Sequence, residues 1–307
     1  MNLLVKKNLI MNQISYSFFT PIKYNDNKFY DKYISRDRYW YNLPALISLN
    51  RLFYPNFEIK FYISPDIINN PLYHLISESI KNQDVTIEVM NQPYKYTEPT
   101  VWRFKPIIES SVDILLCRDI DSIPNEVEVK ATKYFLDNDV YKITSIRSHK
   151  YHNSHGTIML AGLCGFRTKD TLFPNNNFDE FWQIVAKDYW GIDQSFLINF
   201  LFSKGEQWIF NHFLDSRTSN GDNSVLLPNF NCTSYDEKFY LENVNLNIDN
   251  DLLSLLNRIT TWSGEPVNCR GNLLLELFKF DNYDSIKRVK DIVLSNDNLK
   301  KFYIECL

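Results

Sequence analysis

The first half of the chain alternates short apolar segments with segments of helical periodicity, and this alternation restricts the possible folds more than any other feature. Strands are predicted over residues 14–19, 58–63, 85–89, 112–117 and 140–146. Helices are predicted between them, over residues 38–54, 72–81, 101–108 and 124–136. Strand–helix–strand units of this kind form parallel sheets. The pattern therefore predicts an α/β fold with a mostly parallel central sheet flanked by helices.

The second half of the chain is less regular. Strands are predicted over residues 158–166 and 207–214, and helices over 178–187, 192–202, 252–257 and 273–280. Stretches rich in Asn and Asp separate these elements and indicate loops. We expect a main region over residues 1–245 and a helical C-terminal segment over residues 246–307 that packs on it, or one single domain formed by both.

Composition excludes several classes of protein. The chain has 307 residues with 44% hydrophobic residues, enough for a large core. A net charge of −4 without a long basic run argues against nucleic-acid binding. The 5 cysteines are widely spaced without a CxxC pair, which is typical of free thiols. No apolar run reaches the roughly 18–20 residues of a membrane span, and no signal peptide is evident, so we expect a soluble cytoplasmic protein.

An acidic sequence follows the strand predicted over residues 112–117. Asp119 and Asp121 stand one residue apart where this strand ends. Ligands of open α/β sheets bind beside the carboxyl ends of the strands. Two adjacent carboxylates there can hold Mg²⁺ or Mn²⁺, which in turn binds phosphate oxygens. The alternative is an acidic turn that caps the next helix.

Two classes of enzyme have an Asp-x-Asp motif at the end of a strand. In haloacid-dehalogenase-like phosphatases the first Asp is a nucleophile, and the motif ends the opening strand. In GT-A-type glycosyltransferases the motif follows several βα units and holds the metal of a nucleotide-sugar diphosphate. Here it follows three predicted strands, and Gly221-Asp222 is only a weak candidate for the second acidic cluster of the phosphatases. The position favours the glycosyltransferase.

Several short segments carry a resemblance to a known family. They are residues 15–19 (SYSFF), 54–55 (YP), 60–62 (KFY), 102–104 (WRF), 118–122 (RDIDS), 147–149 (RSH) with His152, 159–165 (MLAGLCG) and 193–197 (DQSFL). In this order they resemble GT-A-type glycosyltransferases (nucleotide-diphospho-sugar transferases) with an Arg-Asp-x-Asp-Ser motif, found in microbes and large viruses. The resemblance covers residues 14–200. The chain differs from the family's usual pattern at Ile123, Ser148 and Cys164.

The resemblance implies a metal-dependent enzyme with a GT-A, Rossmann-like fold. Such an enzyme transfers a hexosyl group from a nucleotide-diphosphate sugar, here expected to be a UDP-sugar, to a glycan, a protein or a lipid-linked saccharide. Mn²⁺ or Mg²⁺ would bind the diphosphate and act as a Lewis acid. Asp119 and Asp121 are the expected metal ligands, with Asp121 ranked first. His212 is a candidate third ligand, and a surface histidine at a strand end is the alternative.

The nucleotide is expected at the ends of the first two strands. Tyr16, Phe18 and Thr20 are candidates for contacts with the base or the ribose. Asp66 is a candidate for a hydrogen bond with the edge of uracil. A turn role for Asp66 beside Pro65 is the alternative.

Further residues are expected near the diphosphate and the sugar. Arg103 and Arg118 would neutralise phosphates by bidentate contacts, although a salt bridge on a helix surface is an alternative for Arg103. His149 and His152 are interpreted as sugar or phosphate contacts, because their spacing does not fix a metal geometry. At Gly162 a sugar ring could lie against bare backbone.

Asp193 and Gln194 are the candidate catalytic residues. Asp193 would face the transferred sugar, as a general base if the reaction inverts or as an orienting group if it retains. A helix cap is the structural alternative. The acceptor site is expected to include residues 262–266. A phosphohydrolase and a catalytically inactive GT-A domain that binds sugar or nucleotide are the rival functions.

Overall fold

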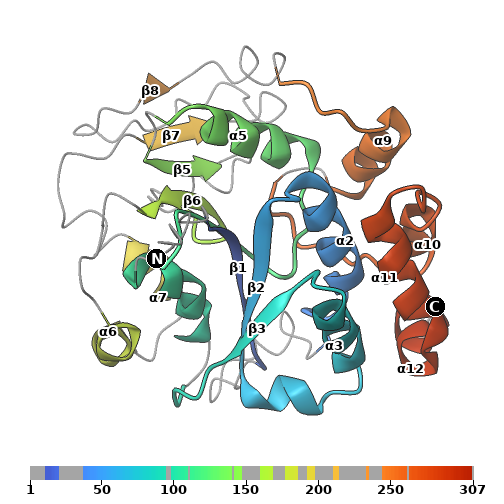
Figure 1. Ribbon diagram of the computed structural model, residues 1–307, viewed down its shortest axis with the longest axis horizontal. Coiled ribbons are helices and arrows are strands. Elements are labelled where there is room, and N and C mark those ends of the chain that lie inside the picture. The colour runs from blue at the N-terminus through green and yellow to red at the C-terminus, as the bar shows by residue number, and fades with distance from the viewer. Residues whose placement is uncertain are drawn as a thin grey trace, which may run out of the picture.

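The structure is a computed structural model that describes residues 11–20, 37–94, 98–109, 111–139, 142–146, 160–168, 177–185, 192–197, 210–213, 233–234, 244–260 and 263–305. Within these ranges, eight strands form one sheet in the order β3-β2-β1-β4-β6-β5-β7-β8 (Figure 1). The strands are β1 (Asn12–Phe18), β2 (Phe57–Ile63), β3 (Thr86–Val89), β4 (Ile114–Arg118), β5 (Ile143–Ile146), β6 (Leu163–Arg167), β7 (Phe210–Phe213) and β8 (Thr233–Ser234). β6 runs antiparallel to β4 and β5, and the other pairs run parallel. The predicted α/β fold with a mostly parallel sheet is confirmed.

Helices pack against both faces of this sheet (Figure 1). One face carries α2 (Leu43–Phe53), η1 (Pro65–Asn69), α3 (Tyr73–Lys81), α9 (Asn250–Ile259), α10 (Asn272–Leu277), α11 (Asp284–Ser295), α12 (Asp297–Lys300) and η7 (Lys301–Glu305). The other face carries η2 (Glu98–Phe104), α4 (Lys105–Ile108), α6 (Phe178–Val185) and α7 (Ile192–Phe196). α5 (Glu126–Asp137) follows β4. None of the helices in the described ranges is long and apolar enough to cross a bilayer.

Successive side chains of each strand point to opposite faces of the sheet, where they belong to two separate core clusters. Ile14, Tyr16 and Phe18 of β1 pack on the face of α2, as does Leu116 of β4. Cys117, the next residue of β4, packs on the opposite face. Successive side chains of a strand point to opposite faces of a sheet, so both faces of β1 and β4 are buried. This explains the apolar run of β4, whereas the second face of β1 is formed by the buried polar residues Gln13, Ser15 and Ser17.

The C-terminal helices complete the core on the α2 face. Leu256, Val293 and Tyr303 belong to the same buried cluster as β1 and α2. The Tyr303 hydroxyl also donates a hydrogen bond to the carbonyl of Trp40, at 2.8 Å. The C-terminal helices therefore share a core with the sheet. These contacts join segments from both sides of residue 245. The division of the chain into two regions at that residue stays a prediction from the sequence.

Some element boundaries differ from the predictions. α2 begins at Leu43 rather than at residue 38, and Pro44 lies in its first turn, where proline is well tolerated. β6 begins at Leu163, because a turn occupies the preceding residues. α11 and α12 were not predicted. In α11 the buried residues Ile286 and Val289 lie three apart, so the helical signal was present and was missed.

Candidate functional site

The acidic loop, residues 119–122, follows β4 at the carboxyl edge of the parallel strands. The register of β1 and β4 pairs Ser15 with Cys117, so both strands end at this edge. The loop is closed by the Ser122 hydroxyl, which donates to the Asp119 carbonyl at 3.1 Å. The following helix α5 is capped by Asn125, whose side chain accepts from the Glu128 backbone at 2.9 Å. Neither aspartate is therefore needed as the cap of that helix.

Arg103 joins the acidic loop to the start of α7. It is only 3% exposed. One terminal nitrogen, Nη1, donates to Asp119 Oδ1, and the other, Nη2, donates to Asp193 Oδ2 at 2.5 Å. Burial alone would lower the pKa of this guanidinium, but Asp119 and Asp193 outweigh burial and raise that pKa. Arg103 is therefore held as a cation between two carboxylates that sequence analysis placed in one site.

Arg103 is itself fixed from the sheet. Its backbone N–H donates to the Ser17 hydroxyl at 3.0 Å, and the same hydroxyl donates to the Thr100 carbonyl at 3.2 Å. Nη1 also donates to the Arg118 carbonyl at 3.2 Å. Contacts with β1 and β4 therefore fix the Arg103 guanidinium, and Arg103 in turn binds the carboxylates of Asp119 and Asp193.

Asp193 is the second residue of α7, and its side chain is mostly enclosed. Burial raises the pKa of its carboxyl, and Arg103 opposes that rise. Oδ1 accepts from the backbone N–H of Gln194 at 2.8 Å. The side chain of Asp193 is 13% exposed, compared with 45% for Asp119. Asp193 is thus a carboxylate at the inner end of the site, and Asp119 is nearer to solvent.

Asp121 has an arginine partner that sequence analysis missed. Its carboxylate forms an ion pair with Arg38, which precedes α2. Burial raises the pKa of Asp121, and Arg38 opposes this. Asp121 also accepts two hydrogen bonds at its backbone carbonyl, from Asn42 Nδ2 at 2.6 Å and from Val267 N at 3.0 Å. These are contacts between distant segments, which no local pattern in the sequence reveals.

Gly162 leaves room for the Asp119 carboxylate. A Cβ atom added at Gly162 would lie 1.9 Å from Asp119 Oδ2, far inside contact distance. Any other residue at this position would therefore force the Asp119 carboxylate to move. The bare backbone predicted to face a sugar ring faces a carboxylate of the acidic loop instead. Gly162 therefore lies against the acidic loop, and its predicted contact with a sugar stays a prediction.

The position of Arg118 does not fit the predicted contact with phosphate. This side chain is 3% exposed and points into the interior. Its Nε donates to Glu128 Oε1 at 2.6 Å, and its Nη1 donates to the carbonyls of Cys117 and Cys164, each at 2.9 Å. Arg118 continues the alternation of β4 and lies beneath α5. Its role is to hold β4, β6 and α5 together.

Tyr16 and Phe18 do not fit the prediction that they contact a base. Both are 1% exposed and belong to the core on the α2 face. The Tyr16 hydroxyl accepts from Asn50 Nδ2 at 2.9 Å, and the Phe18 ring packs edge-on against Trp40 at 4.6 Å. The alternation of β1 sends both side chains into the interior.

Thr20 and Asp66 are brought together at the ends of β1 and β2. The Thr20 hydroxyl donates to Asp66 Oδ2 in an exposed position. The Thr20 carbonyl accepts from the Tyr94 hydroxyl at 3.2 Å. Their predicted contacts with a nucleotide remain a prediction.

The histidines cannot be placed in the site. His149 and His152 lie outside the described residues. The backbone of His212 lies in β7, where it pairs with Ser145 of β5. Two strands, β6 and β5, separate β7 from β4 in the sheet. In the part of the chain that the structure describes, no three His, Cys, Asp or Glu side chains are grouped like metal ligands.

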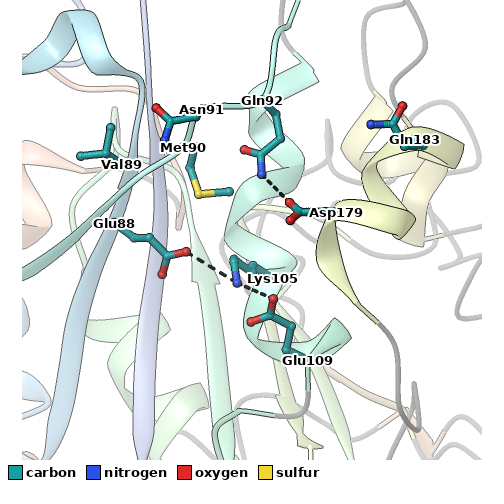
Figure 2. Close-up of a pocket in the computed structure, with 9 residues that line it drawn as sticks. All are labelled: Glu88, Val89, Met90, Asn91, Gln92, Lys105, Glu109, Asp179 and Gln183. Carbon is teal, nitrogen blue, oxygen red and sulfur yellow. Dashed lines mark hydrogen bonds and ion pairs between the residues drawn. The ribbon is translucent and has the colours of Figure 1, made fainter.

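A polar cavity of about 490 Å³ lies at the end of β3, between α4 and α6 (Figure 2). Its lining comprises Glu88, Val89, Met90, Asn91, Gln92, Lys105, Glu109, Asp179 and Gln183. Lys105 points between Glu88 and Glu109, and it forms ion pairs with both. Gln92 Nε2 donates to Asp179 Oδ1 at 2.8 Å. This cavity contains none of the residues predicted from the sequence to form a site.

Comparisons with known proteins do not identify the chain. No protein-family model matches it, and no curated protein sequence matches it at a significant level. The function must therefore be inferred from the fold and the side chains of this chain.

Proposed function

We propose that the protein is a metal-dependent glycosyltransferase that moves a hexosyl group from a nucleotide-diphosphate sugar, a UDP-sugar, to a glycan, protein or lipid-linked saccharide. The observation that carries the proposal is the double contact of the buried Arg103 with Asp119 and Asp193. These carboxylates come from segments far apart in the chain, and they meet at the carboxyl edge of a mostly parallel sheet. That edge is where open α/β sheets bind ligands.

The carboxylates of the acidic loop suit a divalent cation. Asp119 and Asp121 offer hard oxygen ligands, and Gly162 gives the Asp119 carboxylate the space it needs. Mg²⁺ is commonly held by one or two carboxylates together with substrate phosphates, so two protein ligands are sufficient. Asp119 and Asp121 would hold the cation. When bound, it would neutralise the charge that develops on the leaving diphosphate.

The protein's own groups would position the reactants. Arg103 fixes Asp119 relative to Asp193, and Arg38 places a second positive charge beside Asp121. In an inverting reaction, the acceptor oxygen bonds to the anomeric carbon as the bond to the diphosphate breaks. Asp193 would take the proton of the acceptor hydroxyl. In a retaining reaction, Asp193 would orient the sugar.

A phosphohydrolase of the haloacid-dehalogenase type is supported less well. Its first aspartate must attack a phosphorus atom with a free carboxylate oxygen. The motif that would carry this nucleophile follows the fourth strand along the chain here, rather than the first. Trapping a phospho-aspartyl intermediate at Asp119 would overturn the glycosyltransferase proposal.

The proposal is tested by thermal unfolding with UDP-, GDP- and CMP-sugars, each with and without Mn²⁺. A ligand at a hundredfold excess over its Kd stabilises the folded state by about 2.7 kcal/mol. We expect a UDP-sugar with Mn²⁺ to raise the Tm of the wild type and not that of Asp121→Ala. Asp281→Ala is the matched control, because Asp281 pairs with Lys290 on the surface. If no nucleotide stabilises the wild type, or if Asp121→Ala responds equally, the proposal fails.

The same preparation separates an enzyme from a binding domain. An active transferase slowly hydrolyses its UDP-sugar when water replaces the acceptor, and the released UDP can be measured. An inactive domain would bind UDP with Mn²⁺ and release none from any UDP-sugar.

A further inference from the structure

Asn42 connects three segments at the edge of the acidic loop. It immediately precedes α2, and its side chain is fully buried. Nδ2 donates to the carbonyl of Asp121 at 2.6 Å and to that of Val267 at 2.9 Å. Oδ1 accepts from the backbone N–H of Cys269 at 2.9 Å. The amide of Asn42 is thus used both as donor and as acceptor, and all three partners are backbone atoms.

The position of Asn42 just before α2 is one where an asparagine side chain usually caps the helix. Asn is among the residues preferred at the N-terminus of a helix, where its oxygen caps free backbone N–H groups. Asn42 makes no such capping bond to α2. Its polar atoms are directed to the acidic loop and to residues 267–269 instead. Helix formation alone therefore does not account for an asparagine at this position.

Residues 263–269 lie along the acidic loop. Val267 N donates to the Asp121 carbonyl at 3.0 Å. Ser263 Oγ donates to Asn125 Oδ1, the capping atom of α5, at 3.1 Å. Gly264 has a φ of 76°, and a Cβ added there would lie 2.7 Å from Leu163, the first residue of β6. The segment therefore contacts the backbone of the acidic loop, the cap of α5 and the first residue of β6.

We infer that Asn42 is a positioning residue for Asp121 and that residues 263–269 form a wall of the proposed cation–diphosphate site. This inference rests on the proposed function. Asn42 fixes the backbone of Asp121, while Arg38 from the same segment holds its carboxylate. Ligand groups must be held within about 0.5 Å of their productive position. The C-terminal segment thus contributes to nucleotide binding through the main chain of the acidic loop.

Asn50 offers a matched control for a substitution at Asn42. It lies in the same helix region and is 1% exposed. Its Nδ2 donates to the Tyr16 hydroxyl at 2.9 Å and to the Leu46 carbonyl at 2.7 Å, within the core. Asn42→Leu and Asn50→Leu both replace a buried amide by an apolar group of similar branched shape. Both remove buried hydrogen bonds, so both should lower the midpoint of urea unfolding.

The experiment measures the binding of UDP in the presence of Mn²⁺ by titration calorimetry, at a temperature where every variant is folded. We expect Asn42→Leu to weaken this binding at least tenfold and Asn50→Leu to leave it within twofold of the wild type. Equal binding by Asn42→Leu and wild type would overturn the inference and leave the proposed function intact. Failure of the wild type to bind UDP with Mn²⁺ overturns both.

A second variant keeps the inference testable if Asn42→Leu does not fold. Asn42→Ser keeps a neutral polar group, but its hydroxyl donates only one hydrogen bond and so cannot serve the carbonyls of both Asp121 and Val267. It should weaken binding of UDP with Mn²⁺ at least tenfold. Wild-type affinity in this variant would overturn the inference.

Discussion

Arg103 and Arg118 lie on adjacent segments, are equally buried at 3% exposure, and have opposite surroundings. Arg118 pairs with Glu128, whose side chain is also only 3% exposed. Arg103 pairs with Asp119 and Asp193, whose side chains are 45% and 13% exposed. The Arg103 guanidinium contacts the backbone of Arg118, since its Nη1 donates to the Arg118 carbonyl at 3.2 Å. One cation is enclosed by the interior, and the other supports carboxylates that reach toward solvent.

Under the proposed function, this difference separates an arginine that supports the fold from one that supports the site. A buried cation whose partner is also buried contributes to the fold, and removing either partner leaves an uncompensated charge. A buried cation whose partners are partly exposed fixes groups that a ligand can reach. Sequence alone gave both arginines the same role, because both flank predicted site residues. Their partners, and not their burial, distinguish them.

The largest expected effect is on stability and follows from breaking the interior pair. Arg118→Met leaves Glu128 buried without its cation, so the free energy of unfolding should fall by about 3–5 kcal/mol. Urea denaturation measures this loss. The double variant Arg118→Met with Glu128→Leu removes both charges and should recover much of it. A single variant as stable as the wild type would show that this pair does not support the fold.

The next effect is on activity and follows from breaking the two ion pairs of Arg103. Arg103→Met releases Asp119 and Asp193 from their common partner, and we expect kcat/KM for sugar transfer or donor hydrolysis to fall about a hundredfold, or about 2.7 kcal/mol. The stability loss should be smaller than in Arg118→Met, because Asp119 is hydrated and Asp193 can take up a proton. Lys at this position keeps the charge without the two-sided fork, so Arg103→Lys should also be impaired. Full activity in Arg103→Met would contradict the view that Arg103 supports the site while Arg118 supports the fold.

The sequence was sufficient to predict the parallel part of the fold. β4 is buried on both faces and appears as a short apolar run, while β1 and β2 show apolar residues at every second position, and both patterns are typical of strands. The direction of β6 could not be predicted, because an apolar strand pattern is the same in a parallel and an antiparallel pair. α11 was predictable and was overlooked, since its buried residues repeat at helical spacing.

The site was predicted only in part, for a physical reason. Asp119, Asp121, Asp193 and Gly162 stand in motifs, and the structure brings Asp119 and Asp193 together on Arg103, with Gly162 against Asp119. Arg38 and Asn42 were missed, because they act through tertiary contacts with no local pattern. The misplacement of Arg118 was avoidable, since strand alternation puts it on the same face as Leu116, in the interior.

A smaller effect is expected at two glycines, Gly162 beside the acidic loop and Gly165 inside β6. Gly162→Ala puts a methyl group where Asp119 Oδ2 lies, and Gly165→Ala puts one 2.8 Å from Leu116 Cδ2 in the core. We expect Gly162→Ala to weaken binding of UDP with Mn²⁺ about tenfold by displacing a ligand. Gly165→Ala should instead lower the free energy of unfolding by about 1–3 kcal/mol through overpacking, with binding unchanged. Calorimetric titration and urea unfolding of both variants test these expectations. Normal binding by Gly162→Ala, or weakened binding by Gly165→Ala, would contradict them.

The last prediction concerns the pH dependence of the reaction. Burial raises the pKa of Asp193, and Arg103 holds that pKa lower than burial alone would. A base acts in its ionised form, so the transfer rate should fall as the pH falls through this raised pKa, above the range of an ordinary aspartate. Removing Arg103 removes the opposing charge, so in Arg103→Met the acid limb of kcat/KM should move to still higher pH. The double variant Arg118→Met with Glu128→Leu leaves the ion pairs of Arg103 intact. Its kcat/KM should therefore fall over the same acid range as that of the wild type. An acid limb at the same pH in the wild type and Arg103→Met would mean that Asp193 does not titrate in the reaction. The guanidinium of Arg103 would then serve only to fix Asp119.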